Sequence, residues 1–468
     1  MADSRSSANP GRLTDHLSIG VLTKTVPRFV IDEVLAETQR KEKRSRLLPA
    51  HVVVYFVMAL ALFRDGYDEV IRALVHGLRF ARTWSRTWRV PTTSAISQAR
   101  VRLGERTMRA LFTRVAQPLA TAGTPGAWLG PWRLMAIDGV MLDIPETEAN
   151  LAVYEKATGG THRPYPQVKI VGLGECGTHA LTDATIGSIR QGERELAEPL
   201  IRSLGKDMLV MADRGFFSFQ LWRAYLLTGA QLLWRLTKTT YLPVLKVLPD
   251  GSYLSEIKSF RGSGRTRIPF GKIADPMLAT HIPVRVIEYQ IDAGDGLTHL
   301  ETFRLITTIL DPEQADAHEL AMCYTQRWEF ESSLREIECQ LLEPGSTLRS
   351  KTPEMVRQEV WGVFLTHFAI RTFMKEAADT ADLDPDRLST IRAINIIRRS
   401  VTDPAEFPPP PGKARNTAER SMSSSNASTQ PDDHAPTPAS RNERADTHSP
   451  RRTTSTNSGH TSQRSCCE

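Results

Sequence analysis

Two aspartates in the middle of the chain each follow a short apolar run. Asp138 comes directly after residues 134–137, and Asp213 follows residues 208–211 with one residue between. A carboxylate at the C-terminal end of a buried strand lies at the sheet edge where α/β proteins place their sites. Two such carboxylates on neighbouring strands offer the oxygen ligands that Mg²⁺ prefers. Because aspartate before glycine is also a common turn residue, the pair alone leaves both interpretations open.

A later segment, predicted to be helical, places polar side chains on one face. Tyr324, Arg327 and Glu331 are three and four residues apart, and Arg335 and Glu338 continue the same face. Such a face is usually a solvated stripe of ion pairs. Because this helix follows a sheet with two strand-end acids, Glu331 is a candidate for a third acid of the same site.

The segments around these residues predict a mixed α/β sheet, since hairpin strands are followed by alternating helices and strands. Residues 238–302 are rich in Gly, Pro, Thr and alternating apolar positions, which predicts a β-rich insertion before a strand at 303–310. The expected strands cover 134–137, 168–173, 180–189, 208–211 and 232–236, and the expected helices cover 193–204, 220–227, 313–342 and 354–377.

Three short phrases contain the candidate residues in order. They are Ala-Ile-Asp-Gly at 136–139, Ala-Asp-Arg-Gly-Phe-Phe at 212–217 and Tyr-x-x-Arg-Trp-x-x-Glu at 324–331. Tyr-Pro-Gln-Val-Lys at 165–169 and Glu-Cys-Gly-Thr-His-Ala at 175–180 support them. Together these phrases resemble DDE transposases of the insertion-sequence-four group, over about residues 15–400.

The resemblance implies a ribonuclease-H-like catalytic domain over 131–400, with 238–302 as its insertion. It implies that Asp138, Asp213 and Glu331 are catalytic and bind two Mg²⁺ (or Mn²⁺) ions. Paired ions of this kind activate water or a DNA 3′-OH for in-line attack on a phosphodiester. The implied activity is cut-and-paste transposition, in which a homodimer cleaves DNA at terminal inverted repeats and joins the ends to target DNA.

The resemblance also implies that Tyr324 and Arg327 contact transposon-end phosphates and a flipped base, whereas a core-packing Tyr324 is the alternative. The family pattern continues with a Lys seven residues after the Glu, and this chain has Glu338 there. A carboxylate facing the DNA backbone would repel it. Either Arg335 substitutes from one turn earlier, or this copy is impaired.

Residues 15–120 are predicted to be an all-helical DNA-binding domain. Residues 40–46 carry five positive charges and one negative, and residues 72–114 carry ten Arg against the single acid Glu105. This local excess of positive charge indicates a surface for nucleic acid.

Within that domain, residues 92–102 are a candidate recognition helix, which begins with hydroxyl residues suited to capping. Gln98 is suited to reading adenine, and Arg100 and Arg102 to reading guanine or binding phosphate. A helix whose arginines are solvated or paired with acids elsewhere is an equal alternative.

Length and amino-acid composition limit the classes of protein to which the chain can belong. The length of 468 residues suggests two to three domains, and residues 408–468 are predicted to be a disordered tail because they lack large aliphatic and aromatic residues. The formal net charge is +6, and half of it lies in residues 408–465. Five cysteines without disulfide or zinc spacing, a polar N-terminus and a longest apolar run of only 13 residues (51–63) disfavour secreted, zinc-finger and membrane proteins. We therefore expect a cytoplasmic, nucleoid-associated enzyme with no membrane partner.

Two other functions remain open at this point. One is a ribonuclease-H-like nuclease that selects DNA structures without strand transfer. The other is a catalytically silent derivative that binds transposon ends. A transposase gene should lie between inverted repeats, whereas a nuclease gene should not, and a silent derivative would shift end DNA but leave it uncut.

Overall fold

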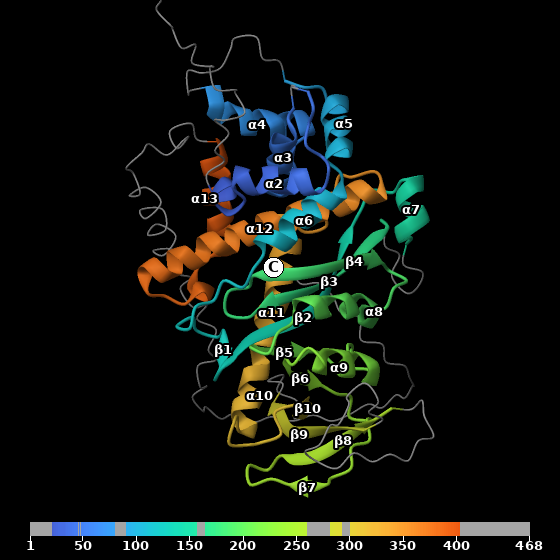
Figure 1. Cartoon of the computed structure of the whole chain (residues 1–468), viewed down its shortest axis with the longest axis vertical. Coiled ribbons are helices and arrows are strands. Elements are labelled where there is room, and N and C mark those ends of the chain that lie inside the picture. The colour runs from blue at the N-terminus through green and yellow to red at the C-terminus, as the bar shows by residue number, and fades with distance from the viewer. Residues whose placement is uncertain are drawn as a thin grey trace, which may run out of the picture.

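The computed structural model describes residues 21–44, 46, 48–79, 90–156, 164–259, 281–292 and 300–402. The predicted tail (408–468) and part of the Arg-rich stretch (80–89) lie outside these residues. The described residues form one mixed sheet with helices on both faces (Figure 1), which confirms the predicted α/β class. Among them, no helix is long and apolar enough to cross a membrane.

The strands pair in the order β4-β3-β2-β5-β6-β10-β9-β8-β7, with β1 added beside β2. β2, β5 and β6 are parallel to one another, and the other pairs are antiparallel. Strands β7, β8 and β9 fall in the range expected to be β-rich, and they extend the same sheet. The strands are β1 (Trp128–Leu129), β2 (Trp132–Asp143), β3 (Gln167–Glu175), β4 (Leu181–Ser188), β5 (Met208–Ala212), β6 (Gln231–Arg235), β7 (Lys246–Val247), β8 (Tyr253–Lys258), β9 (His281–Asp292) and β10 (Leu300–Thr307).

The helices are divided between the two faces of the sheet. One apolar cluster joins α8, η2 and α9 to one face, and a larger cluster joins α10, α11, α12 and the N-terminal helices to the other. The helical elements are α1 (Val21–Thr25), α2 (Arg28–Glu37), α3 (Ala50–Leu62), α4 (Tyr67–Arg79), α5 (Thr93–Leu103), α6 (Glu105–Val115), α7 (Glu148–Tyr154), α8 (Glu193–Ala197), η2 (Glu198–Ser203), α9 (Phe219–Leu226), α10 (Ala317–Thr325), α11 (Arg327–Arg335), η3 (Glu336–Leu341), α12 (Pro353–Ala381), η4 (Pro385–Arg387) and α13 (Thr390–Thr402).

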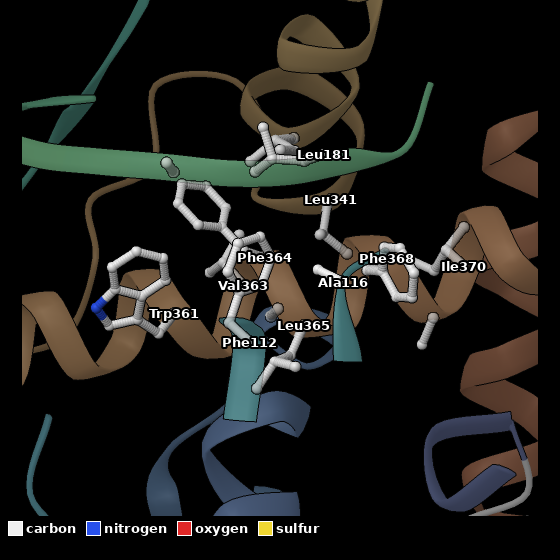
Figure 2. Packing of buried hydrophobic residues seen from close by; sticks show 14 of the residues in the cluster. Phe112, Ala116, Leu181, Leu341, Trp361, Val363, Phe364, Leu365, Phe368 and Ile370 are labelled. Carbon is white, nitrogen blue, oxygen red and sulfur yellow. The ribbon is translucent and has the colours of Figure 1, made fainter. Parts of the chain in front are cut away.

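Helix α12 connects the N-terminal helices to the sheet. The ring centroid of Phe112 on α6 lies 5.3 Å from that of Trp361 and 5.8 Å from that of Phe364. Figure 2 shows these rings packed near Leu181 of β4. Gly362 allows α12 to approach α3 closely, since a Cβ there would overlap the α3 backbone. The N-terminal helices therefore share one apolar core with the C-terminal part of the chain.

Two regions predicted to be helical are interrupted in the structure. Within the region predicted to be all-helical (15–120), the chain is interrupted between α5 and α6 at Gly104, whose φ of 74° few other residues adopt. The helix expected over 313–342 becomes α10 and α11, separated by a turn at Gln326, and then η3, which is a π-helical turn. Turns of this kind are rare and are frequent at functional sites.

Candidate active site

Asp138 lies in the middle of β2, where the neighbouring parallel strand β5 ends. Ile137 pairs with Ala212, so Asp213 is the first residue beyond β5 and follows beside Asp138. This register confirms the prediction that the two acids come from neighbouring strands. The prediction that Asp138 ends its own strand is wrong, because β2 continues to Asp143 and pairs with β3 over that length.

Helix α11 covers the face of β2 from which Asp138 projects. Alternate strand residues face opposite sides, and Ala136, two residues before Asp138, lies in the same apolar cluster as Phe330 of α11. Gly174 on β3 allows the Phe330 ring to approach the sheet, because a Cβ at this position would overlap the ring. The close approach places Glu331, the next residue of α11, near the sheet.

Arg327 joins acids from the two elements. Its Nη1 lies 3.1 Å from Asp138 Oδ2, and its Nη2 lies 3.6 Å from Glu331 Oε2. The side chain of Arg327 is only 9% exposed, so solvent screens these contacts poorly. The Gly139 N–H donates to the other oxygen of Asp138, Oδ1, at 2.7 Å. The structure therefore brings Asp138, Arg327 and Glu331 together as the resemblance implies.

Asp213 has a different cation beside it. Arg235 Nη1 lies 4.0 Å from Asp213 Oδ1, and the Arg235 guanidinium lies 3.8 Å from the centroid of the Phe303 ring. Sequence reasoning missed Arg235. It ends β6, the parallel neighbour of β5, so the same rule that selected Asp213 would have selected Arg235.

Tyr324 is a packing residue in this structure. Its side chain is buried, and its hydroxyl donates to the carbonyl oxygen of Ala212 at 3.2 Å. This geometry favours the alternative of a core-packing tyrosine over the predicted DNA contact. The hydrogen bond fixes the end of β5 immediately before Asp213. Trp328, in contrast, is 55% exposed, and its ring lies 5.7 Å from the Arg327 guanidinium.

The environment of Asp138 disfavours its negative charge. Burial raises the pKa of its carboxyl to about 6, although the Gly139 N–H and Arg327 act in the opposite direction. The charges of Glu331 and Asp213 raise this pKa further. Glu331 and Asp213 are therefore close enough to repel the charge of Asp138, and an additional positive charge would stabilise it.

We expect Asp138→Asn to raise the free energy of unfolding at pH 7 by on the order of 2 kcal/mol. The pKa of Asp138 is raised when the chain folds, from 3.8 to about 6, so its contribution to stability is present below pH 4 and is lost as the pH rises through 6. The gain should shrink as the pH falls from 7 toward 4. The measurement is urea unfolding of the unchanged protein and of Asp138→Asn, in a chelator and at several pH values. A difference in free energy of unfolding that is the same at all pH values would contradict the pKa shift.

The donor atoms of this centre suit a divalent cation that prefers oxygen. Asp138, Asp213 and Glu331 supply three carboxylates, and Asp213 and Glu331 are 34% and 40% exposed. In the described part of the chain, the carboxylate oxygens of these three acids do not all lie within 4.8 Å of one another. Arg327 lies against two of them instead, so a bound ion would share or replace its contacts.

Arg335 continues the face of Glu331, since it lies four residues later within α11, whereas Glu338 lies in the following turn. Both are exposed, and α11 ends at Arg335. The next turn, η3, is π-helical and so holds more residues per turn than an α-helix. The prediction that Glu338 lies on the same helical face as Glu331 is therefore wrong.

The basic residues before and within α5 meet at one hollow. It has a volume of about 390 Å³ and lies between the α2–α3 connection and α5. Glu42 is the acid among its lining residues. The basic residues that line it are Arg40, Lys41, Lys43, Arg44, Arg46 and Arg102. Gln98, one turn before Arg102 on α5, is exposed.

Arg100 does not belong to this surface. It is 2% exposed, and its guanidinium donates to Gln358 Oε1 and Ser350 Oγ, both at 2.9 Å. The prediction that Arg100 reads DNA is therefore wrong, because its donors are used inside the protein. Arg114 is also occupied, since it pairs with Glu33 at 3.0 Å and with Glu37 at 2.5 Å.

Two family models match the chain. The model described as insertion element 4 transposase N-terminal matches residues 16–113, and the model described as transposase DDE domain matches residues 131–369. The chain is 32% identical over 374 residues to the transposase InsG for insertion sequence element IS4 of Escherichia coli (strain K12), over 79% of this chain and 80% of that protein. It is 26% identical over 204 residues to the putative transposase InsZ of the same organism, over 43% of this chain and 65% of that protein.

A solved structure of the piggyBac transposase synaptic complex with hairpin DNA is a remote match, with a TM-score of 0.44 and 12% identity, over 86% of this chain and 84% of that chain. The range matched by the transposase DDE domain model includes the acids on β2, after β5 and on α11. The chain belongs to the DDE transposases of the insertion element 4 family, which use divalent metal ions to cleave DNA and transfer strands, and it catalyses DNA transposition.

Proposed function

We propose that Asp138, Asp213 and Glu331 are the catalytic acids of this transposase and hold two Mg²⁺ (or Mn²⁺) ions. The observation that carries the proposal is Arg327, which contacts Asp138 on the sheet and Glu331 on α11 at once. The register that places Asp213 beside Asp138 supports it further. Three carboxylates cancel much of the charge of two ions and still leave positions for phosphate and water.

Bound ions would activate the attacking water or 3′-OH and stabilise the leaving oxygen. The chain itself positions the groups around them. Arg327 aligns two of the acids and offers donors to a phosphate, and Tyr324 fixes the strand end before Asp213. Trp328 presents an exposed ring beside Arg327, suited to stacking on an unpaired base.

The strand order β4-β3-β2-β5-β6 supports a ribonuclease-H-like core for the catalytic domain, over 131–400, with 238–302 as its insertion. We assign 15–120 to a DNA-binding domain and 408–468 to a tail. The reaction we propose is cut-and-paste transposition between terminal inverted repeats and target DNA. A homodimer would hold both ends in a synaptic complex, in the cytoplasm and associated with the nucleoid.

The experiment that tests this function uses a DNA fragment that carries the gene with its native flanks. The full chain is added with Mg²⁺, and the products are sequenced at their ends. Release of the element at its inverted repeats, followed by joining to a second DNA, would support transposition. Cleavage at branched or mismatched sites elsewhere would favour the nuclease, and a gel shift without cleavage would favour the silent derivative.

The basic hollow is our candidate for binding end DNA, together with Gln98 and with Arg335 on α11. We expect DNA affinity to fall steeply with salt, because each phosphate contact contributes a slope of about 0.9 in log affinity against log salt. Changing Arg40, Lys43 and Arg102 to Gln should reduce that slope by roughly three, about one for each cation removed. The measurement is DNA binding at several salt concentrations.

Arg114→Gln is the matched control for these changes. Arg114 is a cation of the same region, but it is paired with Glu33 and Glu37. For Arg114→Gln, the slope of log DNA affinity against log salt should equal that of the unchanged protein. An equal reduction in the control and in the triple variant would show that overall charge, and not the hollow, determines binding.

We expect Glu338→Lys to increase DNA cleavage several-fold. Glu338 is exposed near the C-terminal end of the helix that carries Glu331, so its carboxylate repels a nearby phosphate backbone and an ammonium would attract it. The measurement is the rate of end cleavage at low salt, where surface charges act most strongly. Glu354→Lys, the same change of charge at the start of α12, is the control. An unchanged or lower rate for Glu338→Lys would place this residue away from the DNA.

A further inference from the structure

A buried ionic cluster lies on the side of α11 and η3 away from the three acids. Its centre is Glu336, the first residue of the π-helical turn, which is 8% exposed. Arg371 Nη1 lies 3.2 Å from Glu336 Oε1, and Thr390 donates to the same oxygen at 2.9 Å. His367 Nε2 lies 3.3 Å from Glu336 Oε2. These partners keep Glu336 anionic inside the protein.

His179 connects this cluster to the surface. It follows the β3–β4 turn with a φ of 57°, which is uncommon for a residue other than glycine, and it is 7% exposed. Its Nδ1 lies 3.3 Å from Glu336 Oε1. An imidazole that donates from Nδ1 to a carboxylate presents the lone pair of Nε2 on its other side. This carboxylate–histidine arrangement is the usual support of a metal-binding histidine.

The Nε2 atom of His179 points toward two further carboxylates. It lies 3.1 Å from Asp386 Oδ1 without the alignment of a hydrogen bond, and it is a buried nitrogen with no hydrogen-bond partner among the described residues. Its ligand atom and those of Glu329 and Asp386 all lie within 4.8 Å of one another. Glu329 is oriented by the Gly177 N–H, which donates to its Oε2.

The 3.1 Å between His179 Nε2 and Asp386 Oδ1 suits two ligands of one small cation. Two donors that bind an ion at about 2.1 Å each, with roughly 90–109° between them, lie about 3.0–3.4 Å apart. We propose that His179, Glu329 and Asp386 form a Zn²⁺ site, distinct from the three catalytic acids. The imidazole distinguishes it chemically, since a nitrogen donor favours Zn²⁺ whereas a set of carboxylates alone suits Mg²⁺.

The charges that face the site are consistent with a divalent ion. Three carboxylates surround it, those of Glu329, Asp386 and Glu336, and the guanidinium of Arg371 is the cation among them, with Nη2 3.9 Å from Asp386 Oδ1. Two negative charges remain when His179 is neutral. Because Asp386 is exposed, an ion can enter from solvent.

A proton on His179 is the competing way to balance this charge. Burial and Arg371 lower the pKa of His179, but its contacts with the carboxylates of Asp386 and Glu336 outweigh them and raise it to about 9. Zn²⁺ must therefore displace that proton. A protein that never binds Zn²⁺ would keep the same contacts with an imidazolium.

The site would connect three segments that are far apart in the chain. His179 belongs to the β3–β4 connection, Glu329 to α11 and Asp386 to η4. Helix α11 also carries Arg327 and Glu331, two residues before and after Glu329. A bound ion would therefore hold α11 against the sheet and would fix the position of the proposed catalytic glutamate.

The test measures Zn²⁺ binding to the full chain after treatment with a chelator. Excess Mg²⁺ is kept present, so that the carboxylate centre holds its own ion. Asp386→Asn removes one ligand at an exposed position and should leave the fold intact. Asp382→Asn is the matched control, since it changes the same charge four residues away, at an exposed residue whose φ of 53° asparagine tolerates.

We expect one Zn²⁺ per chain in the unchanged protein and in Asp382→Asn, and an affinity at least about tenfold lower in Asp386→Asn. Asp138→Ala should bind Zn²⁺ as the unchanged protein does, even though its cleavage activity is expected to be lost. Equal affinity in Asp386→Asn and the control would overturn the site, and so would the absence of Zn²⁺ from the unchanged protein. Loss of Zn²⁺ in Asp138→Ala alone would assign the ion to the catalytic acids and also overturn it.

Discussion

We expect Asp138→Asn to slow DNA cleavage at the transposon ends by about a thousandfold or more. Asparagine has nearly the same shape and keeps an oxygen that accepts the Gly139 N–H. It loses the negative charge, and with it a ligand for divalent metal. Metal ions supply several kcal/mol of transition-state stabilisation, and a loss of about 4 kcal/mol corresponds to a factor of about a thousand.

The measurement is the single-turnover rate of end cleavage in Mg²⁺, with DNA binding measured in parallel by gel shift. Asp143→Asn is the matched control, because it is the same change five residues later on β2. Its side-chain oxygen accepts a hydrogen bond from Gln167 Nε2 at 2.7 Å, which asparagine preserves. Cleavage should be nearly unchanged in the control, and DNA binding should persist in both. A loss of less than tenfold in Asp138→Asn would remove Asp138 from the catalytic acids.

The same substitution separates activity from stability. Asp138→Asn should raise the free energy of unfolding, because burial and two other acids disfavour the Asp138 charge. A change that stabilises the fold and abolishes the reaction is expected where a site is built for a ligand and not for the stability of the free protein. A general packing defect would lower activity and stability together, so the two measurements distinguish these causes.

The sequence predicts the two sheet acids because local signals specify them. Short apolar runs end at Asp138 and Asp213, and adjacent parallel strands bring such ends together. It does not predict that β2 continues beyond Asp138. Gly139 is typical of a turn, yet here it lies within β2 and pairs with Val171 of β3. That pairing depends on a strand about 30 residues later, which no local pattern reveals.

The segment with Tyr324 and Arg327, which spans the end of α10 and the start of α11, shows a second limit of the sequence prediction. The spacing of three and four residues correctly places Arg327 and Glu331 near each other. The spacing does not predict which side chain faces the protein interior. Tyr324 is buried because β5 ends beneath it and offers the Ala212 carbonyl, whereas Trp328 is exposed. The more apolar residue is the one at the surface, so hydrophobicity alone would assign the two incorrectly.

Arg100 and Arg102 show the same limit of the sequence prediction in the N-terminal helices. Residues two apart on a helix lie on nearly opposite sides, so one of them faces the interior. Charge gives no indication of which one, because burial of an arginine depends on acceptors elsewhere. The acceptors for Arg100 are Ser350 and Gln358, about 250 residues later in the chain.

Arg100→Met should therefore lower the free energy of unfolding by roughly 3–4 kcal/mol, since several hydrogen bonds from a buried cation are lost and their acceptors stay buried. Arg102→Met should change it by less than about 0.5 kcal/mol and weaken DNA binding instead. Urea unfolding and DNA binding of both variants give the comparison. If Arg100→Met kept its stability and lost selectivity for the transposon ends, Arg100 would be a DNA-reading residue and not a structural one. If it unfolds more easily, the α5–α12 contact holds the N-terminal helices to the rest of the chain.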